Sequence, residues 1–101
     1  MAKGYWVAQV DVSDMEQYKK YIAANAKPFK EFGARFVVRG GQSENVEGKH
    51  RSRTVVIEFP SYQAALDCYQ SPDYQAALKL RATASVADIV IIEGYDGIQP
   101  G

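Results

Sequence analysis

The stretch RFVVRGGQSENVEGKHRSRTVVIEF, residues 35–59, holds two apolar runs joined by a long polar connection. Runs rich in valine, isoleucine and phenylalanine are typical of β-strands, and a polar connection with a glycine is typical of a hairpin. We therefore predict strands over residues 34–41 and 53–59, with Gly48 in the connection. The same stretch concentrates positive charge at Arg35, Arg39, Lys49, Arg51 and Arg53.

Two further runs are typical of strands, GYWVAQVDV at residues 4–12 and ADIVIIEGY at residues 87–95. The segments after the first and third strands have the three-to-four-residue periodicity of helices. The resulting order, β-α-β-β-α-β, predicts a ferredoxin-like α+β sandwich with helices on one face of a four-stranded antiparallel sheet. At 101 residues, we expect one domain spanning residues 1–101.

Helix boundaries are also predicted by local signals. The motif SDME predicts a capping box, with Ser13 as N-cap and the Glu16 carboxylate reaching back to it. Pro28 predicts a kink or break, and Gly33 the end of the segment. The second helical segment is expected to begin at Ser61, restart at Ser71 with Pro72 in its first turn, and run to about Ala84. The predicted buried stripe of the first helix comprises Met15, Tyr18, Ile22, Ala26 and Phe29.

The strands TVVIEF and DIVIIEG are apolar at both alternating positions. An antiparallel sheet covered on one side usually alternates apolar and polar residues. Because helices cover only one face, we expect the same sheet of a second copy to cover the other, which predicts a homodimer.

Four segments carry a family resemblance over nearly the whole chain: KGYWVAQVDVSDMEQYKKY, RFVVRGG, VVIEFPSYQAALDCYQSPDYQAALKLR and ADIVIIEGY. With these, the sequence resembles the domain-of-unknown-function 1330 family of the dimeric α+β barrel superfamily. The resemblance implies a homodimer whose two sheets form a barrel, with a pocket between helices and sheet in each subunit. Superfamily relatives include cofactor-independent monooxygenases, muconolactone isomerases, haem-degrading enzymes and ligand-sensing domains, and the family itself has no agreed reaction.

Composition excludes several classes of function. Twelve lysines and arginines balance twelve aspartates and glutamates, so the chain lacks the strong positive charge of a nucleic-acid-binding domain. No apolar stretch approaches the length of about 20 residues that a membrane span needs, and the N-terminus lacks the apolar run of a signal peptide. Cys68 is the lone cysteine, so no internal disulfide forms. We expect a cytoplasmic protein with neither a nucleic-acid nor a membrane partner.

Arg81 is a candidate ligand residue because it interrupts an apolar helical stripe that includes Tyr74 and Leu78. It either pairs with a carboxylate such as Glu58 or Glu93, caps the helix end, or anchors an anion in a pocket. Tyr69 and Tyr74 are on similar stripes and either pack in the core or donate hydrogen bonds to a ligand.

Arg39 and Arg53 flank the hairpin and are also candidates. They either pair across strands with Glu58 or Glu93, stay solvated, or form a cationic mouth that binds a carboxylate through two parallel hydrogen bonds. Glu58 would be a proton acceptor if it is buried. Gly40 and Gly41 are expected to end the strand, since no phosphate-loop spacing surrounds them.

His50 is the lone histidine and lies in a charged loop, so we expect it to be solvated and expect neither a metal site nor a tightly bound cofactor. Cys68 is expected to be a small buried residue. Two hypotheses remain. The first is a small enzyme, an oxygenase or isomerase acting on an aromatic or carboxylated metabolite. The second is a non-catalytic binding module or structural dimer.

Overall fold

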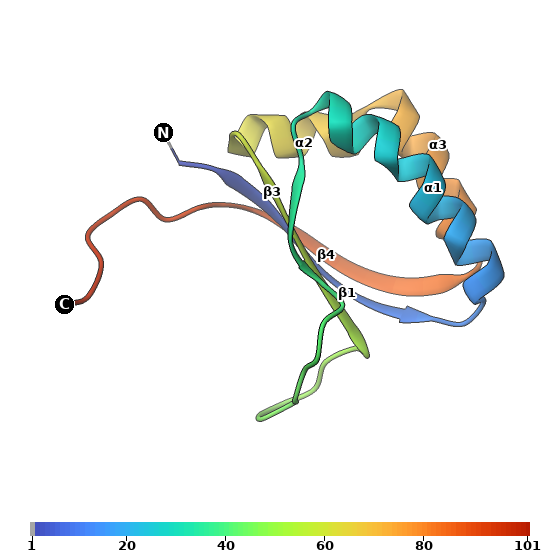
Figure 1. The fold of residues 1–101 in the computed structure, drawn as a ribbon, viewed down its shortest axis with the longest axis horizontal. Coiled ribbons are helices and arrows are strands. Elements are labelled where there is room, and N and C mark those ends of the chain that lie inside the picture. Colours follow the sequence, from blue (N-terminus) through green and yellow to red (C-terminus); the bar gives the residue numbers. More distant parts are fainter. Residues whose placement is uncertain (1) are drawn as a thin grey trace.

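The computed structural model describes residues 2–101 and has two layers, a twisted antiparallel sheet and a layer of helices on one of its faces (Figure 1). The strands lie in the order β2-β3-β1-β4, and every neighbouring pair is antiparallel. This arrangement confirms the predicted ferredoxin-like α+β fold, with the second helical segment divided at Ser71. The elements are β1 (Gly4–Val12), α1 (Met15–Glu31), β2 (Arg35–Arg39), β3 (Arg53–Phe59), α2 (Tyr62–Gln70), α3 (Pro72–Arg81) and β4 (Ser85–Glu93).

The start of α1 differs from the predicted one, and the capping box at Ser13 is wrong. The backbone N–H and the Oγ of Ser13 both donate to the Ala84 carbonyl, at 2.8 and 3.0 Å. Asp14 is the N-cap instead, in extended conformation, and its side chain accepts from the Gln17 N–H at 3.2 Å. Glu16 is exposed and does not complete a capping box. The contact with Ala84 thus moves the cap by one residue.

Pro28 was predicted to kink or break the helix; it does not break it, since α1 continues to Glu31. Proline removes one backbone hydrogen bond from a helix interior. Here the ring is fully buried, and burial of apolar surface offsets part of that cost. Gly33, with φ +73°, ends the segment as predicted, because glycine adopts this left-handed conformation without a steric penalty.

The buried face of α1 is rotated slightly from the predicted stripe. Met15 is 50% exposed and Ala26 is exposed, whereas Tyr21 and Asn25 are buried. The residues of α1 that are buried against the sheet and α3 are Tyr18, Tyr21, Asn25, Pro28 and Phe29. Two tyrosines and an asparagine therefore face the interior, where they need polar partners.

The core is centred on Trp6 of β1, which is 1% exposed. Its indole N–H donates to the Ala65 carbonyl of α2 at 2.9 Å, so its polar atom is satisfied. The rings packed on it have centroids between 4.8 and 5.6 Å away and belong to Phe29, Phe59, Tyr69 and Tyr74. Helices and sheet are thus joined mainly by aromatic contacts.

The sheet face away from the helices carries a row of valines. Val7 of β1 lies opposite Val56 of β3 and Val90 of β4, and Val56 lies opposite Val38 of β2. Directly opposed residues share a face of the sheet, so the row crosses all four strands. Val38 and Val90 are 40% and 53% exposed, and β4 adds Ile92 at 51%. The middle of this face is therefore apolar and open in the single chain.

Candidate functional site

A pocket lies between the sheet, α1 and α3, and its polar lining is mainly cationic and phenolic. The pocket has a volume of about 40 Å³. A cavity of this size holds a few water molecules at most. Arginines from β2, β3 and α3 reach it, namely Arg39, Arg53 and Arg81, so the structure brings three of the predicted candidates to one place.

Arg81 is placed by the stripe of α3 that faces α1. It is 8% exposed, and Tyr74 and Ala77 on the same stripe are also buried. Its Cζ lies 5.3 Å from the centroid of the Tyr21 ring, in a cation–π arrangement. Burial lowers the pKa of Arg81. The phenols of Tyr74 and Tyr21 together raise it by more than burial lowers it, so the net pKa is raised. Arg81 therefore stays a cation inside the molecule.

Three tyrosines surround this cation. The hydroxyl oxygens of Tyr21 and Tyr74 lie 2.9 Å apart and share a buried hydrogen bond. Burial raises the pKa of Tyr74, and the adjacent Tyr21 raises it further. Burial also raises the pKa of Tyr18, against the opposing effect of the nearby positive charges of Arg53 and Arg81. All three phenols line or back the pocket, and burial favours the neutral form of Tyr18 and Tyr74.

Arg53 reaches the pocket because of the strand register. It lies opposite Val10 of β1, which faces the helices, so its side chain lies on the same face. Its Nε is buried and has no hydrogen-bond partner among residues 2–101. Buried polar groups in folded proteins are nearly always hydrogen-bonded to protein or to ordered water, so this nitrogen is a donor that a water molecule or a ligand can satisfy.

Arg39 lies at the exposed side of the pocket. Its register partner is Val55, which faces the helices, and its Cζ stacks 4.0 Å from the centroid of the Phe36 ring. The side chain is exposed, and within residues 2–101 it makes no ion pair and stacks on Phe36. Arg39 is therefore the pocket arginine with the most freedom to move.

The carboxylates that were considered as partners for these arginines lie elsewhere. Glu58 is on the opposite face of the sheet, where it accepts from Arg35 Nε at 3.1 Å and from the Tyr5 hydroxyl at 3.3 Å. Glu93 is exposed at the end of β4. In the part of the chain that the structure describes, none of the five ion pairs involves Arg39, Arg53 or Arg81.

The six candidate residues thus separate into four groups. The three arginines line the pocket, while Tyr74 supports it from behind through Tyr21. Tyr69 packs against Trp6 and Tyr74 in the core, and Glu58 is outside the pocket. The pocket residues that the sequence reasoning did not single out are Tyr21, Asn25 and Phe36, and the shifted helical stripe would have indicated the first two.

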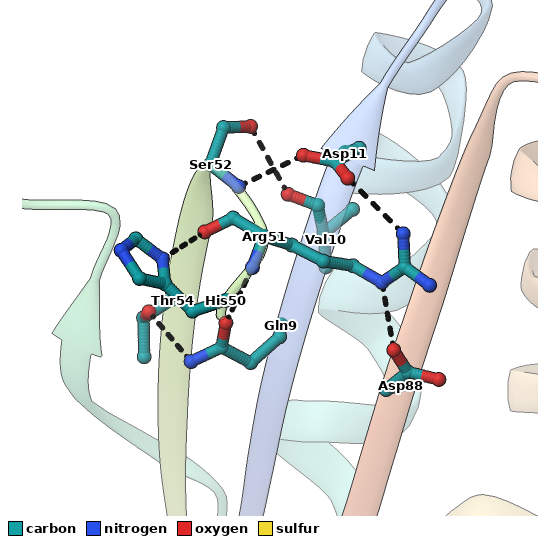
Figure 2. A network of polar contacts seen from close by, with 8 residues as sticks. All are labelled: Gln9, Val10, Asp11, His50, Arg51, Ser52, Thr54 and Asp88. Carbon is teal, nitrogen blue, oxygen red and sulfur yellow. Dashed lines mark hydrogen bonds and ion pairs between the residues drawn. The ribbon is translucent and has the colours of Figure 1, made fainter. Parts of the chain in front are cut away.

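A second polar cluster lies on the opposite face of the sheet (Figure 2). Arg51 bridges two strands there, with Nη1 3.1 Å from Asp11 Oδ2 on β1 and Nε 2.7 Å from Asp88 Oδ2 on β4. The Ser52 N–H also donates to Asp11, at 2.8 Å. His50 is exposed, and its Nδ1 lies 2.5 Å from the carbonyl of Arg51. Arg51 therefore fastens the hairpin to the sheet, a role that the sequence reasoning missed because the acids come from distant strands.

Other reactive groups offer little chemistry. Among residues 2–101, no three side chains of the His, Cys, Asp or Glu type gather closely enough to hold a metal ion. Burial raises the pKa of the Cys68 thiol to about 12, so this buried cysteine is a poor nucleophile at neutral pH. Over the same described range, no helix is long and apolar enough to cross a membrane.

A sheet of order β2-β3-β1-β4 with helices on one face defines the ferredoxin-like class of α+β proteins. Residues 3–95 match the family described as Domain of unknown function (DUF1330), and the chain belongs to this family. No curated protein matches the sequence.

Solved structures with the same fold have low sequence identity to this chain. A protein of unknown function from Rhodopseudomonas palustris is 19% identical with a TM-score of 0.75, over 98% of this chain and 85% of that one. SnoaB, a cofactor-independent oxygenase from Streptomyces nogalater, is 12% identical with a TM-score of 0.63, over 99% and 100%. A dimeric ferredoxin-like protein of unknown function from Thermobifida fusca is 18% identical with a TM-score of 0.57, over 91% of each chain. At these identities the likeness establishes the shared fold.

Proposed function

We propose that this protein is a cytoplasmic homodimer that binds a small organic anion in the pocket between α1, α3 and the sheet. The observation that carries the proposal is the set of pocket arginines, Arg39, Arg53 and Arg81, which have no carboxylate partner among the described residues. The chain has as many acidic as basic residues, yet none of the acidic ones lines the pocket. A bound anion would supply the missing negative charge and hydrogen-bond acceptors.

The walls of the pocket favour a ligand with an apolar body. Besides the arginines, the lining is formed largely by aromatic and aliphatic side chains, including Phe29, Phe36 and Ile89. Ligand pockets are commonly apolar with a few convergent polar groups. Because the pocket is small, it must widen to hold a ring-sized ligand. Movement of Arg39 away from Phe36 would widen it.

A catalytic role is the second candidate, as a cofactor-independent oxygenase or isomerase. The fold shared with SnoaB favours it, but the pocket lining contains no Asp, Glu, His or Cys. Burial raises the pKa of Tyr18 and of Tyr74, so these phenols are poor proton acceptors at neutral pH. A substrate would therefore have to bind already ionised, with the arginines stabilising its charge. For this reason we place binding first and catalysis second.

The homodimer part of the proposal rests on the outward face of the sheet. The row formed by Val38, Val56, Val7 and Val90 would be covered by the same row of a second copy. Contiguous exposed apolar patches usually mark interaction surfaces. The Thermobifida fusca protein of the same fold is dimeric, which supports a dimer for this chain as well.

Calorimetric titration with a small panel of probes tests the binding proposal. The anions are acetate, benzoate, benzenesulfonate and phenyl phosphate, and benzamide is the neutral control. We expect at least one anion to bind while benzamide does not, and Arg81→Met to weaken that binding by about 1.5–3 kcal/mol, the range for hydrogen bonds to charged groups. Lys79→Met is the matched control, since Lys79 is an exposed cation on the same helix.

Two results would contradict the proposal. One is the absence of binding by every anion. The other is anion binding that Arg81→Met leaves unchanged while the melting temperature falls sharply, which would make Arg81 part of the scaffold. Oxygen uptake with the bound anion as the sole substrate separates the catalytic candidate from simple binding.

A further inference from the structure

The position of Arg53 depends on a neighbouring glycine. Gly40, directly after β2, has φ +65° and donates its N–H to the Thr54 carbonyl at 2.8 Å. A Cβ added at Gly40 would lie 2.5 Å from Nη1 and 2.8 Å from Cζ of Arg53. The Arg53 guanidinium therefore occupies space that any other residue at position 40 would fill.

Arg53 also carries the one orphaned polar atom that the structure shows. Its Nε is buried without a hydrogen-bond partner within residues 2–101, and the side chain lines the pocket. In an arginine, Nε–H and one Nη–H point in nearly the same direction and form a planar fork, so an acceptor group that pairs with Nε can pair with Nη as well. Two acceptor oxygens in one plane complement this fork.

We infer that the ligand carries a carboxylate bound through the Arg53 fork, and that Gly40 is a positioning residue that holds this fork at the pocket. This inference rests on the proposed function, because it specifies which anion the pocket takes. It also gives Gly40 a role beyond ending the strand.

The lining differs from that of phosphate sites built on backbone N–H groups. Phosphate sites are usually built from backbone N–H groups at a helix N-terminus or a glycine-rich loop, with lysine or hydroxyl side chains. Neither glycine, lysine, serine nor threonine lines this pocket, and α3 approaches it with the C-terminal residue Arg81.

Gly48 provides a matched control for Gly40. It has a similar backbone conformation, φ +74°, but a Cβ added there would meet nothing within 4 Å. Gly40→Ala and Gly48→Ala therefore introduce similar backbone strain, and only the first displaces the Arg53 guanidinium.

The experiment measures the affinities of benzoate, acetate and phenyl phosphate by calorimetry for the wild type, Gly40→Ala, Gly48→Ala, Arg53→Met and the Gly40→Ala/Arg53→Met double variant. We expect benzoate to bind at least about tenfold more tightly than phenyl phosphate. Gly40→Ala should weaken benzoate by about tenfold or more, and Gly48→Ala by less than about twofold. In the Arg53→Met background, Gly40→Ala should cause no further loss, because a residue that acts only through Arg53 has no effect without it.

A conservative variant, Arg53→Lys, tests the inference even if Gly40→Ala does not fold. Arg53→Lys keeps the charge and removes the fork, so it should fold as the wild type does by circular dichroism and still bind benzoate about tenfold more weakly. Equal weakening by Gly40→Ala and Gly48→Ala, wild-type affinity in Arg53→Lys, or tighter binding of phenyl phosphate would overturn the inference while leaving anion binding intact. Failure of all the anions to bind would instead overturn the proposed function itself.

Discussion

The hydroxyls of Tyr21 and Tyr74 meet at 2.9 Å between α1 and α3, and they differ in their access to the pocket. Tyr74 is 0% exposed, whereas Tyr21 is 7% exposed and lines the pocket. The Arg81 guanidinium, which also lines the pocket, lies over the Tyr21 ring. This hydrogen bond therefore joins the packing of the two helices to the shape of the candidate site.

Removal of the two hydroxyls should have unequal effects on the free energy of unfolding. Tyr21→Phe leaves the Tyr74 hydroxyl hydrogen buried without an acceptor and should cost about 1–3 kcal/mol. Tyr74→Phe leaves the Tyr21 hydroxyl at the pocket, where water can replace the partner, and should cost about 0.5–1.5 kcal/mol. The double variant should be no less stable than Tyr21→Phe. Urea unfolding at fixed protein concentration measures all three, and equal single costs that add in the double variant would contradict the expected asymmetry.

The cap of α1 offers a second comparison. Asp14→Ala should destabilise the protein by about 1 kcal/mol, the usual loss for an N-cap side chain. Ser13→Ala removes instead the hydrogen bond from Oγ to the Ala84 carbonyl, worth about 0.5–1.5 kcal/mol. Amide hydrogen exchange separates the two roles. Asp14→Ala should increase exchange in the first turn of α1, and a change confined to the start of β4 would contradict the assignment of Asp14 as the cap.

Local signals in the sequence were sufficient for the architecture. Runs rich in β-branched and aromatic residues indicated the strands, and Ser71 followed by Pro72 indicated the helix restart, because both effects act between residues that are neighbours in the chain. Ser13 and Asp14 are both good cap residues. The hydrogen bond from Ser13 to the Ala84 carbonyl, which is distant in sequence, leaves Asp14 as the N-cap. The break expected at Pro28 does not occur for the same reason, since the burial of its ring depends on tertiary packing.

The candidate site was only partly predictable. Arg81 was indicated by a charge on an apolar stripe, but the meeting of Arg39 and Arg53 with it depends on strand register. Register decides which face a strand residue occupies, and a shift of one residue reverses it. Glu58 shows the consequence, because it belongs to the same strand as Arg53 but lies on the opposite face.

The cluster around Arg51 should make stability depend on pH at acidic values (Figure 2). Hydrogen bonds from Ser52, foremost from its backbone N–H, and from Arg51 lower the pKa of Asp11. A carboxylate whose pKa is lower in the folded state stabilises the protein fully above its unfolded pKa of about 3.9, and this contribution is lost as the pH falls through the folded pKa. Asp11→Asn should therefore lower the melting temperature near neutral pH, and the gap to the wild type should close below about pH 4.

Glu44→Gln is the control for that series, since Glu44 is an exposed carboxylate in the β2–β3 connection. It should leave the melting temperature near the wild-type value across the same pH range. A gap between Asp11→Asn and the wild type that stays constant down to the acid limit would show that Asp11 does not contribute through its charge.

The outward valine row predicts the behaviour of a charged variant. Val56→Asp would bury a carboxylate without a partner in the proposed dimer interface, at a cost of several kcal/mol, and should dissociate or unfold the dimer. Val46→Asp adds the same charge at a loop residue that is 86% exposed and should leave the assembly unchanged. Sedimentation at micromolar concentration measures both variants. A wild-type protein that sediments as a stable monomer would rule out the homodimer.

The central claim is that the arginine-lined pocket takes a small organic anion, and the most direct test locates such an anion. Crystals grown with 4-bromobenzoate can be measured at the bromine absorption edge, which marks the ligand independently of the protein density. We predict a bromine peak between α1, α3 and the sheet, with the carboxylate toward Arg53 and Arg81. Bromine peaks only outside this pocket, in crystals where calorimetry shows the protein to be saturated, would contradict the claim.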